Sequence, residues 1–286
     1  MNIQIPEPVD NWLLNNGQGE VDSVSPVSGG SINQAFRLKT NKKFNYFLKI
    51  NKNCPPDMFL REAEGLELLD IESGPRVPKV HLFGDNFILL EDIRSRKRKT
   101  NCWKKFGQQL VSLHQVTNLE FGLPQDNYIG STPQSNYQTE NGFEFFANQR
   151  LIFQAELAAK SSLLTTQEVN FVFSLASKLI ELIPLQKASL IHGDLWGGNL
   201  IIGPIGEPVI IDPAAHFAWP EADLAMTTLF GSFPVEFYRT YEKFSDIEPD
   251  WQNRADIYNL YHLLNHLNIF GMGYHASVMK ILKKYA

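Results

Sequence analysis

Residues 190–202 of this 286-residue chain read Leu-Ile-His-Gly-Asp-Leu-Trp-Gly-Gly-Asn-Leu-Ile-Ile, and residues 208–214 read Pro-Val-Ile-Ile-Asp-Pro-Ala. Two short apolar runs rich in Ile and Val bracket a turn that holds Asp194 and Asn199, and the second run ends on Asp212. Apolar runs of this length, separated by glycine and proline, are typical of buried strands joined by a tight turn. We therefore predict a β-hairpin with acidic groups at its two ends.

The two aspartates need a chemical reason to stand at strand ends. An uncompensated buried carboxylate is costly or changes its pKa, so Asp194 and Asp212 are expected to face a cleft, to be paired or to bind a cation. The order His-x-Asp-x-x-x-x-Asn, then Asp after a short strand, matches the phosphoryl-transfer template, in which the first Asp orients the attacking hydroxyl and the Asn and second Asp hold Mg²⁺. A lone His-Gly-Asp is more often a turn with a capping Asp. Here the partners agree in order and spacing, which favours phosphoryl transfer.

Composition sets the class of protein. A chain with 43% hydrophobic and 20% charged residues fits a globular enzyme or binding protein, and a net charge of -5 argues against a general nucleic-acid binder. Cys54 and Cys102 are too few for a disulfide framework or a cysteine zinc site, which fits a reducing compartment. Neither a signal peptide nor an apolar run of membrane-spanning length is recognisable. We expect a cytoplasmic protein without nucleic-acid or membrane partners.

The first third of the chain predicts strands around a glycine turn. A short helix over 8–16 precedes predicted strands over 21–27 and 34–38, and Gly29-Gly30-Ser31-Ile32-Asn33 lies between these strands. Paired glycines permit a tight turn whose backbone N–H groups can approach a phosphate. A Gly-Gly hairpin is more often only a hairpin, and the pattern is neither Gly-x-Gly-x-x-Gly nor a Walker loop.

Lys49 and Glu62 are predicted to form an ion pair. Lys49 lies in a predicted strand over 44–50, where the kinase template has its phosphate-binding lysine, although a lysine in a strand is usually its solvent-facing member. A helix over 56–71 follows, with proline at its start and glycine beyond its end. At 3.6 residues per turn Glu62 falls on the apolar face of that helix and requires a cationic partner.

The remaining pattern places a lobe boundary near Asp92. Predicted strands over 77–83 and 87–93 form a hairpin, and the basic run 94–99 is most simply a solvated loop. The chain then becomes mainly helical, so we expect a lobe over 1–92 and a second lobe over 93–286. Its predicted elements are a helix from 103 to about 117, a loop over 121–136, helices over 143–160 and 166–183, a helix beginning at Glu221, and helices over 257–270 and 277–285.

The ordered set of motifs resembles the protein-kinase-like fold in its small-molecule phosphotransferase branch. Within that branch the chain resembles the fructosamine kinases, also called ketosamine-3-kinases, over nearly its whole length. Eight motifs in the same order carry the resemblance: Gly-Gly-Ser-Ile-Asn-Gln-Ala-Phe (29–36), Glu-Ala-x-Gly-Leu (62–66), Asn-Tyr-Ile-Gly-x-Thr-Pro-Gln (127–134), Phe-Phe-x-x-x-Arg-Leu (145–151), His-Gly-Asp-Leu-Trp-Gly-Gly-Asn (192–199), Asp-Pro-Ala (212–214), Glu-Ala-Asp-Leu-Ala-Met (221–226) and Leu-Leu-Asn-His-Leu-Asn-x-Phe-Gly (263–271).

The resemblance implies an α+β, two-lobed protein-kinase-like fold, with a small antiparallel β-sheet lobe carrying one helix and a larger, mainly helical lobe. ATP and Mg²⁺ are the implied cofactors. Asp194 then matches the catalytic base, Asn199 and Asp212 the Mg²⁺ ligands, and Lys49 the phosphate ligand held by Glu62. The resemblance also assigns nucleotide contacts to the glycine turn and to the backbone at the lobe boundary, namely to Gly29, Gly30, Ser31, Asn33, Glu91 and Ile93.

The implied acceptor is the 3-hydroxyl of a ketosamine, either a small molecule or an adduct of a protein lysine. Trp196 and His266 match walls of the sugar pocket, although either could be a packed core residue, and for His266 that interpretation is nearly as good. Asp223 is expected to anchor the catalytic loop. The chain departs from the family at 216–220 and around 142–143, which bears on substrate identity more than on catalysis.

Four other functions stay open at this point. A kinase for an aminoglycoside, choline or another small alcohol shares the His-Gly-Asp core and is the main alternative. An inactive nucleotide-binding module is opposed by the intact set of Lys49, Asp194, Asn199 and Asp212, and a metal-dependent hydrolase lacks further ligands at a recognisable spacing. A protein kinase fits poorly, because the segment 213–220 is too short for an activation segment. Oligomeric state cannot be read from the sequence.

Overall fold

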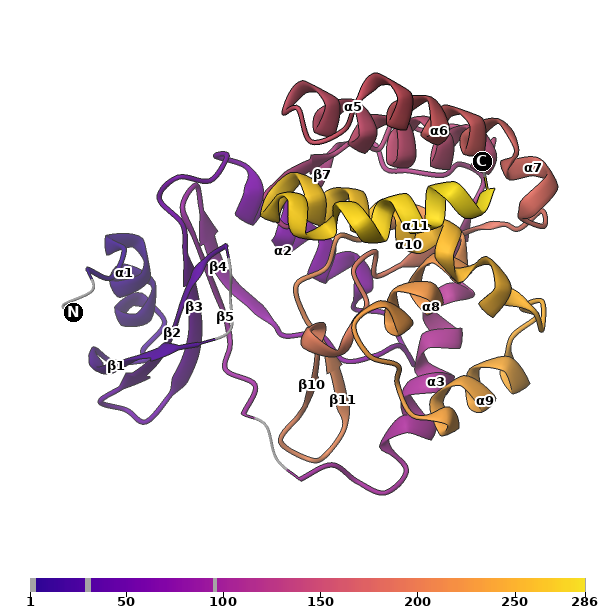
Figure 1. The fold of residues 1–286 in the computed structure, drawn as a ribbon. Helices are drawn as coiled ribbons and strands as arrows, with labels where there is room; N and C mark the ends of the chain where they lie inside the picture. Colours follow the sequence, from indigo (N-terminus) through magenta and orange to yellow (C-terminus); the bar gives the residue numbers. More distant parts are fainter. Residues whose placement is uncertain (1–3, 29–31, 95–96, 286) are drawn as a thin grey trace.

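The computed structural model describes residues 4–28, 32–94 and 97–285. Gly29, Gly30 and Ser31, which we predicted to bind phosphate, lie outside the described residues. A five-stranded antiparallel sheet forms the part on the left of Figure 1, and a mainly helical part lies on the right. The fold is therefore α+β, as predicted.

The sheet has the order β1-β2-β3-β5-β4. Lys49 pairs with Ala35 on one side and Ile88 on the other, so it lies in the central strand. Helix α1 (Glu7–Asn15) covers one face through Val9 and Leu13. The strands are β1 (Val21–Val27), β2 (Gln34–Thr40), β3 (Asn45–Ile50), β4 (Val80–Gly84) and β5 (Phe87–Glu91).

Helix α2 (Met58–Leu69) packs in the large core cluster, which joins the sheet to the helical part. Its buried Phe59 and Leu66 join the large core cluster that also contains the helices of the second part. Gly65 faces Pro213, and a Cβ at Gly65 would lie 3.3 Å from the proline ring. The N-cap residue Asp57 accepts a 2.6 Å hydrogen bond from the Tyr128 hydroxyl. The helix that carries Glu62 is thus fixed against the helical part.

The helical part is built around α10 (Trp251–Phe270), which is buried on nearly all sides. It packs on α8 and α5 and continues through a turn into α11. The other helices are α3 (Cys102–His114), α4 (Gly142–Phe145), a π-helical segment (Phe146–Ile152), α5 (Phe153–Lys160), α6 (Thr166–Ser177), α7 (Leu179–Leu182), α8 (Pro220–Leu229), α9 (Val235–Phe244) and α11 (His275–Tyr285).

Short strands complete this part, and the two aspartates follow two of them, Asp194 after β9 and Asp212 after β11. Strand β9 pairs with β12 and β6, and β10 pairs with β11. Their bounds are β6 (Thr117–Asn118), β7 (Asn127–Ile129), β8 (Thr132–Gln134), β9 (Ala188–Ile191), β10 (Leu200–Ile202), β11 (Pro208–Ile210) and β12 (His216–Ala218).

The predicted hairpin around the catalytic motif needs correction. The hairpin consists of β10 and β11 with a turn over 203–207, whereas the run that ends at Ile191 pairs with β12. Asp194 and Asn199 therefore lie in a connecting loop between two sheets and not in a hairpin turn. Local hydrophobicity identified both runs as strands but carries no information on which strands pair.

Several predicted boundaries also change. The predicted loop 121–136 contains the β7–β8 hairpin, and the predicted helix 143–160 is interrupted by the π-helical segment. Helix α9 was not predicted, and α10 begins at Trp251 and not at residue 257. Helix α6 begins with a capping box formed by Thr165 and Glu168.

A buried ion pair ties α8 to α10. Arg254 donates two hydrogen bonds to Glu221, of 2.9 and 2.7 Å, and the Tyr258 hydroxyl donates a third of 2.9 Å. The Glu221 side chain is fully buried, so its charge depends on these partners. Asp223 follows Glu221 by two residues, and this pairing fixes its helix.

We expect Arg254→Met to lower the free energy of unfolding by about 3–5 kcal/mol, because it leaves the Glu221 carboxylate buried without its cation. The melting temperature should fall by roughly 6 °C or more, measured by calorimetry. Lys284→Met removes a cation from the half-exposed pair with Asp256 and should cost no more than about 1 kcal/mol. Equal melting temperatures for the two variants would contradict a structural role for the buried pair.

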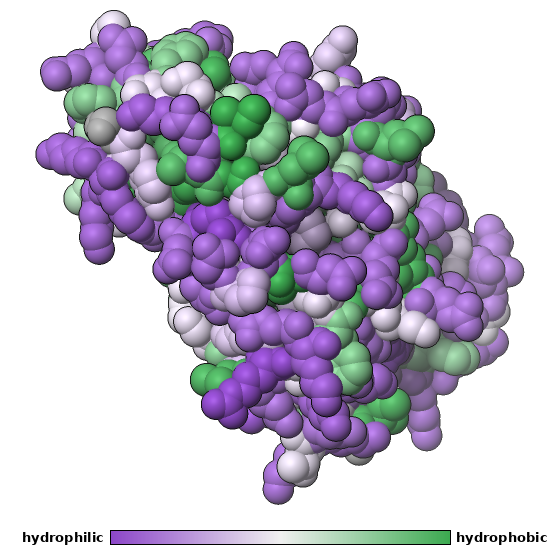
Figure 2. Space-filling model, turned by 90° about the vertical axis from the view of Figure 1, so that its right-hand side faces the viewer, coloured by the Kyte–Doolittle hydropathy of each residue, from purple (hydrophilic) through white to green (hydrophobic). Residues whose placement is uncertain are grey.

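Within the described ranges, no helix is both long enough and apolar enough to cross a bilayer. The face shown in Figure 2 is dominated by polar side chains, with apolar side chains in separate patches.

Candidate active site

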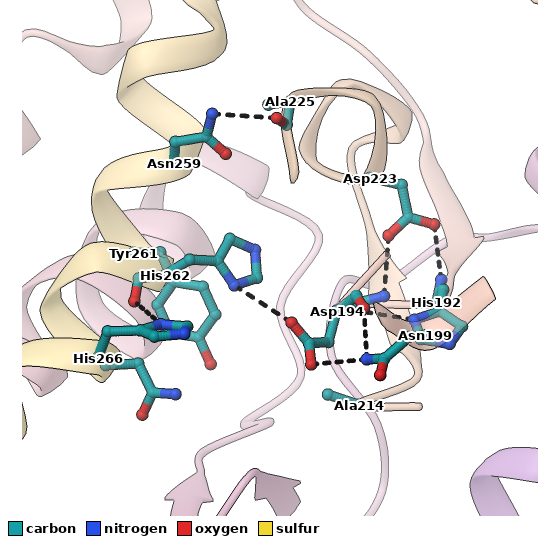
Figure 3. A network of polar contacts seen from close by, with 12 residues as sticks. His192, Asp194, Asn199, Ala214, Asp223, Ala225, Asn259, Tyr261, His262 and His266 are labelled. Carbon is teal, nitrogen blue, oxygen red and sulfur yellow. Dashed lines mark hydrogen bonds and ion pairs between the residues drawn. The ribbon is translucent and has the colours of Figure 1, made fainter. Parts of the chain in front are cut away.

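The loop after β9 is held by Asp223. Its buried carboxylate accepts hydrogen bonds from the backbone N–H groups of His192, at 2.7 Å, and Gly193, at 2.9 Å (Figure 3). His114 contacts the same carboxylate at 3.2 Å. Burial alone would raise the pKa of Asp223, but these partners lower it, so the carboxylate stays charged. The expectation that Asp223 anchors the catalytic loop agrees with these contacts.

Only glycine fits at residue 193. Its φ is +80°, and a Cβ there would lie 2.2 Å from the carbonyl oxygen of Ala214. The Ala214 N–H donates to the His192 carbonyl at 3.0 Å, so the two segments lie side by side. The Gly of His-Gly-Asp is thus required by the close approach of the segment that follows Asp212.

His192 links the loop to the strand before Asp212. Its Nε2–H donates to the Ile211 carbonyl at 3.0 Å, and its Nδ1 accepts from the Asp194 N–H at 3.2 Å. Burial lowers the pKa of His192, which keeps the ring neutral and suits one donated and one accepted hydrogen bond. The imidazole therefore fixes the backbone of Asp194 relative to the backbone just before Asp212.

Asp194 has one engaged oxygen and one open oxygen. Asn199 Nδ2 donates to Asp194 Oδ2 at 2.9 Å and to the Asp194 carbonyl, also at 2.9 Å. Over the described ranges no group donates a hydrogen bond to Oδ1, which lies 4.0 Å from His262 Nδ1. Burial raises the pKa of Asp194 to about 7, against the effect of Asn199 and assisted by the charges of Asp212 and Asp223.

Lys49 joins β3, α2 and the segment after β11. Its Nζ lies 2.6 Å from Glu62 Oε1 and 2.6 Å from Asp212 Oδ1, so the predicted ion pair with Glu62 is confirmed. Burial alone would lower the pKa of Lys49, but the two carboxylates raise it above its ordinary value. Asp212 has a φ of +54°, a strained conformation for a residue with a side chain and one that occurs often at functional sites.

Asn199 and Asp212 form a donor set that fits Mg²⁺. They lie at the same end of the β10–β11 hairpin, where the Ile211 N–H donates to the Asn199 carbonyl at 3.0 Å. Asn199 uses its amide nitrogen on Asp194, which leaves Oδ1, and Asp212 uses Oδ1 on Lys49, which leaves Oδ2. One amide oxygen and one carboxylate oxygen suit an ion that completes its shell with phosphates and water.

The other residues assigned to the nucleotide have partners within the protein. Asn33 Oδ1 accepts a 3.0 Å hydrogen bond from Asn51. The Glu91 N–H donates to the Lys79 carbonyl at 2.9 Å, and the Ile93 N–H donates to the Glu91 carbonyl at 3.1 Å. The nucleotide contacts of all three stay a prediction, and adenine binding at the lobe boundary requires the Ile93 N–H to exchange its partner.

Trp196 and His266 belong to one run of aromatic rings. The Trp196 ring lies 5.6 Å from Phe230, and Phe230 lies 5.0 Å from His266, measured between ring centroids. His266 Nδ1–H donates to the His262 carbonyl at 2.7 Å, which fixes the ring (Figure 3). Phe230 is 41% exposed and was not singled out from the sequence. The run offers an apolar wall at which sugar carbons can pack.

We expect Asp194→Asn to raise the melting temperature at pH 8 by about 2 °C or more. The folded-state pKa of about 7 lies above the ordinary value of 3.8, so ionisation costs more in the folded protein. Wild-type stability should therefore fall as pH rises from about 4 to 7, and the advantage of the variant should vanish toward pH 4. Calorimetry between pH 4 and 8 measures this.

The matched control is Asp246→Asn, at an exposed carboxylate after α9. It should shift the melting temperature by less than about 1 °C over the same range. A variant Asp194→Asn that is no more stable than wild type at pH 8 would contradict a strained, desolvated carboxylate.

Comparison with solved structures defines the class of protein. An ADP-bound aminoglycoside phosphotransferase superposes with a TM-score of 0.62 at 16% identity, and each chain covers 97% of the other. A crystal structure from Thermobifida fusca, provisionally described as a fructosamine-3-kinase, superposes with a TM-score of 0.86 at 29% identity, covering 96% of this chain and 97% of its own. The fold is that of the protein-kinase-like phosphotransferases.

Sequence comparison gives the family. The profile described as Fructosamine kinase matches residues 9–286. A relative from Synechocystis, described as a probable ketoamine kinase, is 40% identical over 90% of this chain and 88% of its own length. The chloroplastic protein-ribulosamine 3-kinase of Arabidopsis thaliana is 34% identical over 98% of this chain and 87% of its own length. The chain belongs to the fructosamine kinase family, and it is a phosphotransferase.

Proposed function

We propose that the protein transfers the γ-phosphoryl group of ATP to the 3-hydroxyl of a ketosamine, with Asp194 as the base. The observation that carries this proposal is the pair of aspartates. Asp194 has Oδ2 held by Asn199 and Oδ1 open, and Asp212 is bound by the Lys49–Glu62 pair. This arrangement supplies both halves of the phosphoryl-transfer template.

The chain's own residues would divide the work as follows. Asp194 Oδ1 orients the acceptor hydroxyl and takes its proton as the oxygen attacks phosphorus, and ADP leaves. Lys49 holds the phosphates, with Glu62 fixing its ammonium group. Asn199 Oδ1 and Asp212 Oδ2 hold Mg²⁺, which when bound neutralises charge that develops on the phosphate oxygens. The nucleotide would lie between residues 1–92 and residues 93–286, with Gly29, Gly30 and Ser31 over its phosphates.

The aromatic run supports a sugar acceptor. Trp196 and His266 offer ring faces to a sugar. The imidazole of His266 is neutral, because burial lowers its pKa. Neutral groups can hold hydroxyls without demanding a charged sugar. Family membership and relatives described as ketoamine and ribulosamine kinases favour a sugar joined to an amine over an aminoglycoside. The two cysteines are free, which suits a cytoplasmic setting.

We expect ribulosamine, fructosamine or erythrulosamine adducts of lysine to be phosphorylated with ATP and Mg²⁺, and gentamicin and choline not to be. Phosphorus NMR locates the new phosphate, which should lie on the 3-hydroxyl. Asp194→Asn should lower kcat on the ketosamine by about 10²–10⁴-fold with little change in MgATP affinity. Phosphate on gentamicin or choline and on no ketosamine would move the protein to the alternative function.

The nucleotide side has its own test. Glu62→Gln should reduce kcat/KM for MgATP by about tenfold or more, because Lys49 loses the charged partner that orients it. Glu64→Gln is the matched control, since Glu64 lies on the same helix, is half-exposed and pairs with Arg61. That control should change kcat/KM less than twofold. Equal effects of the two substitutions would argue against Lys49 as the phosphate ligand.

A further inference from the structure

His262 is a buried histidine on α10. The ring nitrogen that faces the active site has no hydrogen-bond partner among the described residues. The residue lies one turn before His266 on α10, and its ring points toward Asp194 (Figure 3). Its side chain is 5% exposed, and Nδ1 is a buried atom without a hydrogen-bond partner in the part of the chain that the structure describes. A buried polar atom left unpaired costs about 1–3 kcal/mol, so such an atom calls for a ligand.

The unpaired Nδ1 of His262 lies near the oxygen of Asp194 that has no donor, Oδ1. Nδ1 lies 4.0 Å from Asp194 Oδ1, whereas Asp194 Oδ2 is occupied by Asn199. This separation is too long for a hydrogen bond, so neither atom satisfies the other. A hydroxyl that gives its proton to Asp194 must approach Oδ1, and it then lies beside His262.

The imidazole is neutral in this setting. Burial lowers the pKa of His262 to about 3, and the charge of His266 would act in the same direction. Ionisable groups near it on other elements include Asp194, Asp223, Arg150 and His216. A neutral ring can present one N–H, and a donor at Nδ1 matches a carbonyl or hydroxyl oxygen of an uncharged sugar.

We infer that His262 Nδ1–H donates to the acceptor oxygen on the carbon next to the reacting hydroxyl, so that the site selects acceptors with oxygens on adjacent carbons. In a ketosamine this is the C2 oxygen, either the carbonyl or its hemiketal hydroxyl, beside the 3-hydroxyl. Oxygens on adjacent carbons lie about one hydrogen-bond length apart, which lets hydrogen bonds to Asp194 and His262 converge on them. The inference rests on the proposed function and adds a specificity-determining residue to it.

A cycle that pairs one protein variant with one altered ligand tests this. The ligands are a ketosamine and its analogue with a methylene group at C2, and the proteins are wild type and His262→Leu. The KM for the ketosamine should rise at least tenfold in His262→Leu, whereas the inhibition constant of the methylene analogue should change less than twofold. His262→Asn, whose amide can donate from a similar position, should recover most of the loss.

A merely packed histidine would give a different result. Equal losses for the ketosamine and the methylene analogue, or no loss for either, would overturn the inference. His262→Ala repeats the deletion with a smaller side chain in case the leucine variant does not fold, and His275→Leu, at a histidine bonded to Glu168, is the control. Failure of the proposed function would appear separately, as wild-type protein that phosphorylates no ketosamine.

Discussion

The rest of the site depends on the hydrogen bonds that the buried carboxylate of Asp223 accepts. It fixes two successive backbone N–H groups of the catalytic loop, and its own helix is tied to α10 by the Glu221–Arg254 pair. Helix α10 in turn carries His262 and His266. One chain of polar contacts through the core therefore sets where the loop of Asp194 lies and where His262 and His266 stand. Carboxylates so buried keep their charge only because N–H groups and cations surround them.

Residues with local or periodic signals were the ones that the sequence predicted well. The strands of the sheet follow from short apolar runs, and the Lys49–Glu62 pair follows from one helical period and one strand. The β7–β8 hairpin was missed because Pro133 and its polar neighbours look like loop. The predicted pairing of the β9 run was wrong, because pairing between strands that are far apart along the chain leaves no local pattern in the sequence. Helix α9 had a usable signal in the spacing of Phe237 and Tyr241.

The residues of the candidate site also divide into those that the sequence pointed to and those that it did not. Motif spacing predicted Asp194, Asn199 and Asp212 as site residues, because kinase chemistry fixes their order along the chain. It pointed to His266 but not to His262, although both lie on one face of α10, since nothing in a sequence shows which of two histidines already has its polar atom engaged. The structure shows that difference directly: His266 donates to a carbonyl, and His262 has an unpaired Nδ1.

The packing of α2 against the helical part has a consequence for regulation. In a kinase whose corresponding helix packs loosely, outward rotation of that helix separates the lysine from its glutamate and turns the enzyme off. Here such a rotation would expose Phe59 and Leu66, at a cost of roughly 3 kcal/mol or more. The separated state would then be populated at less than about one molecule in a hundred. The packing of the folded chain itself thus keeps the Lys49–Glu62 pair formed.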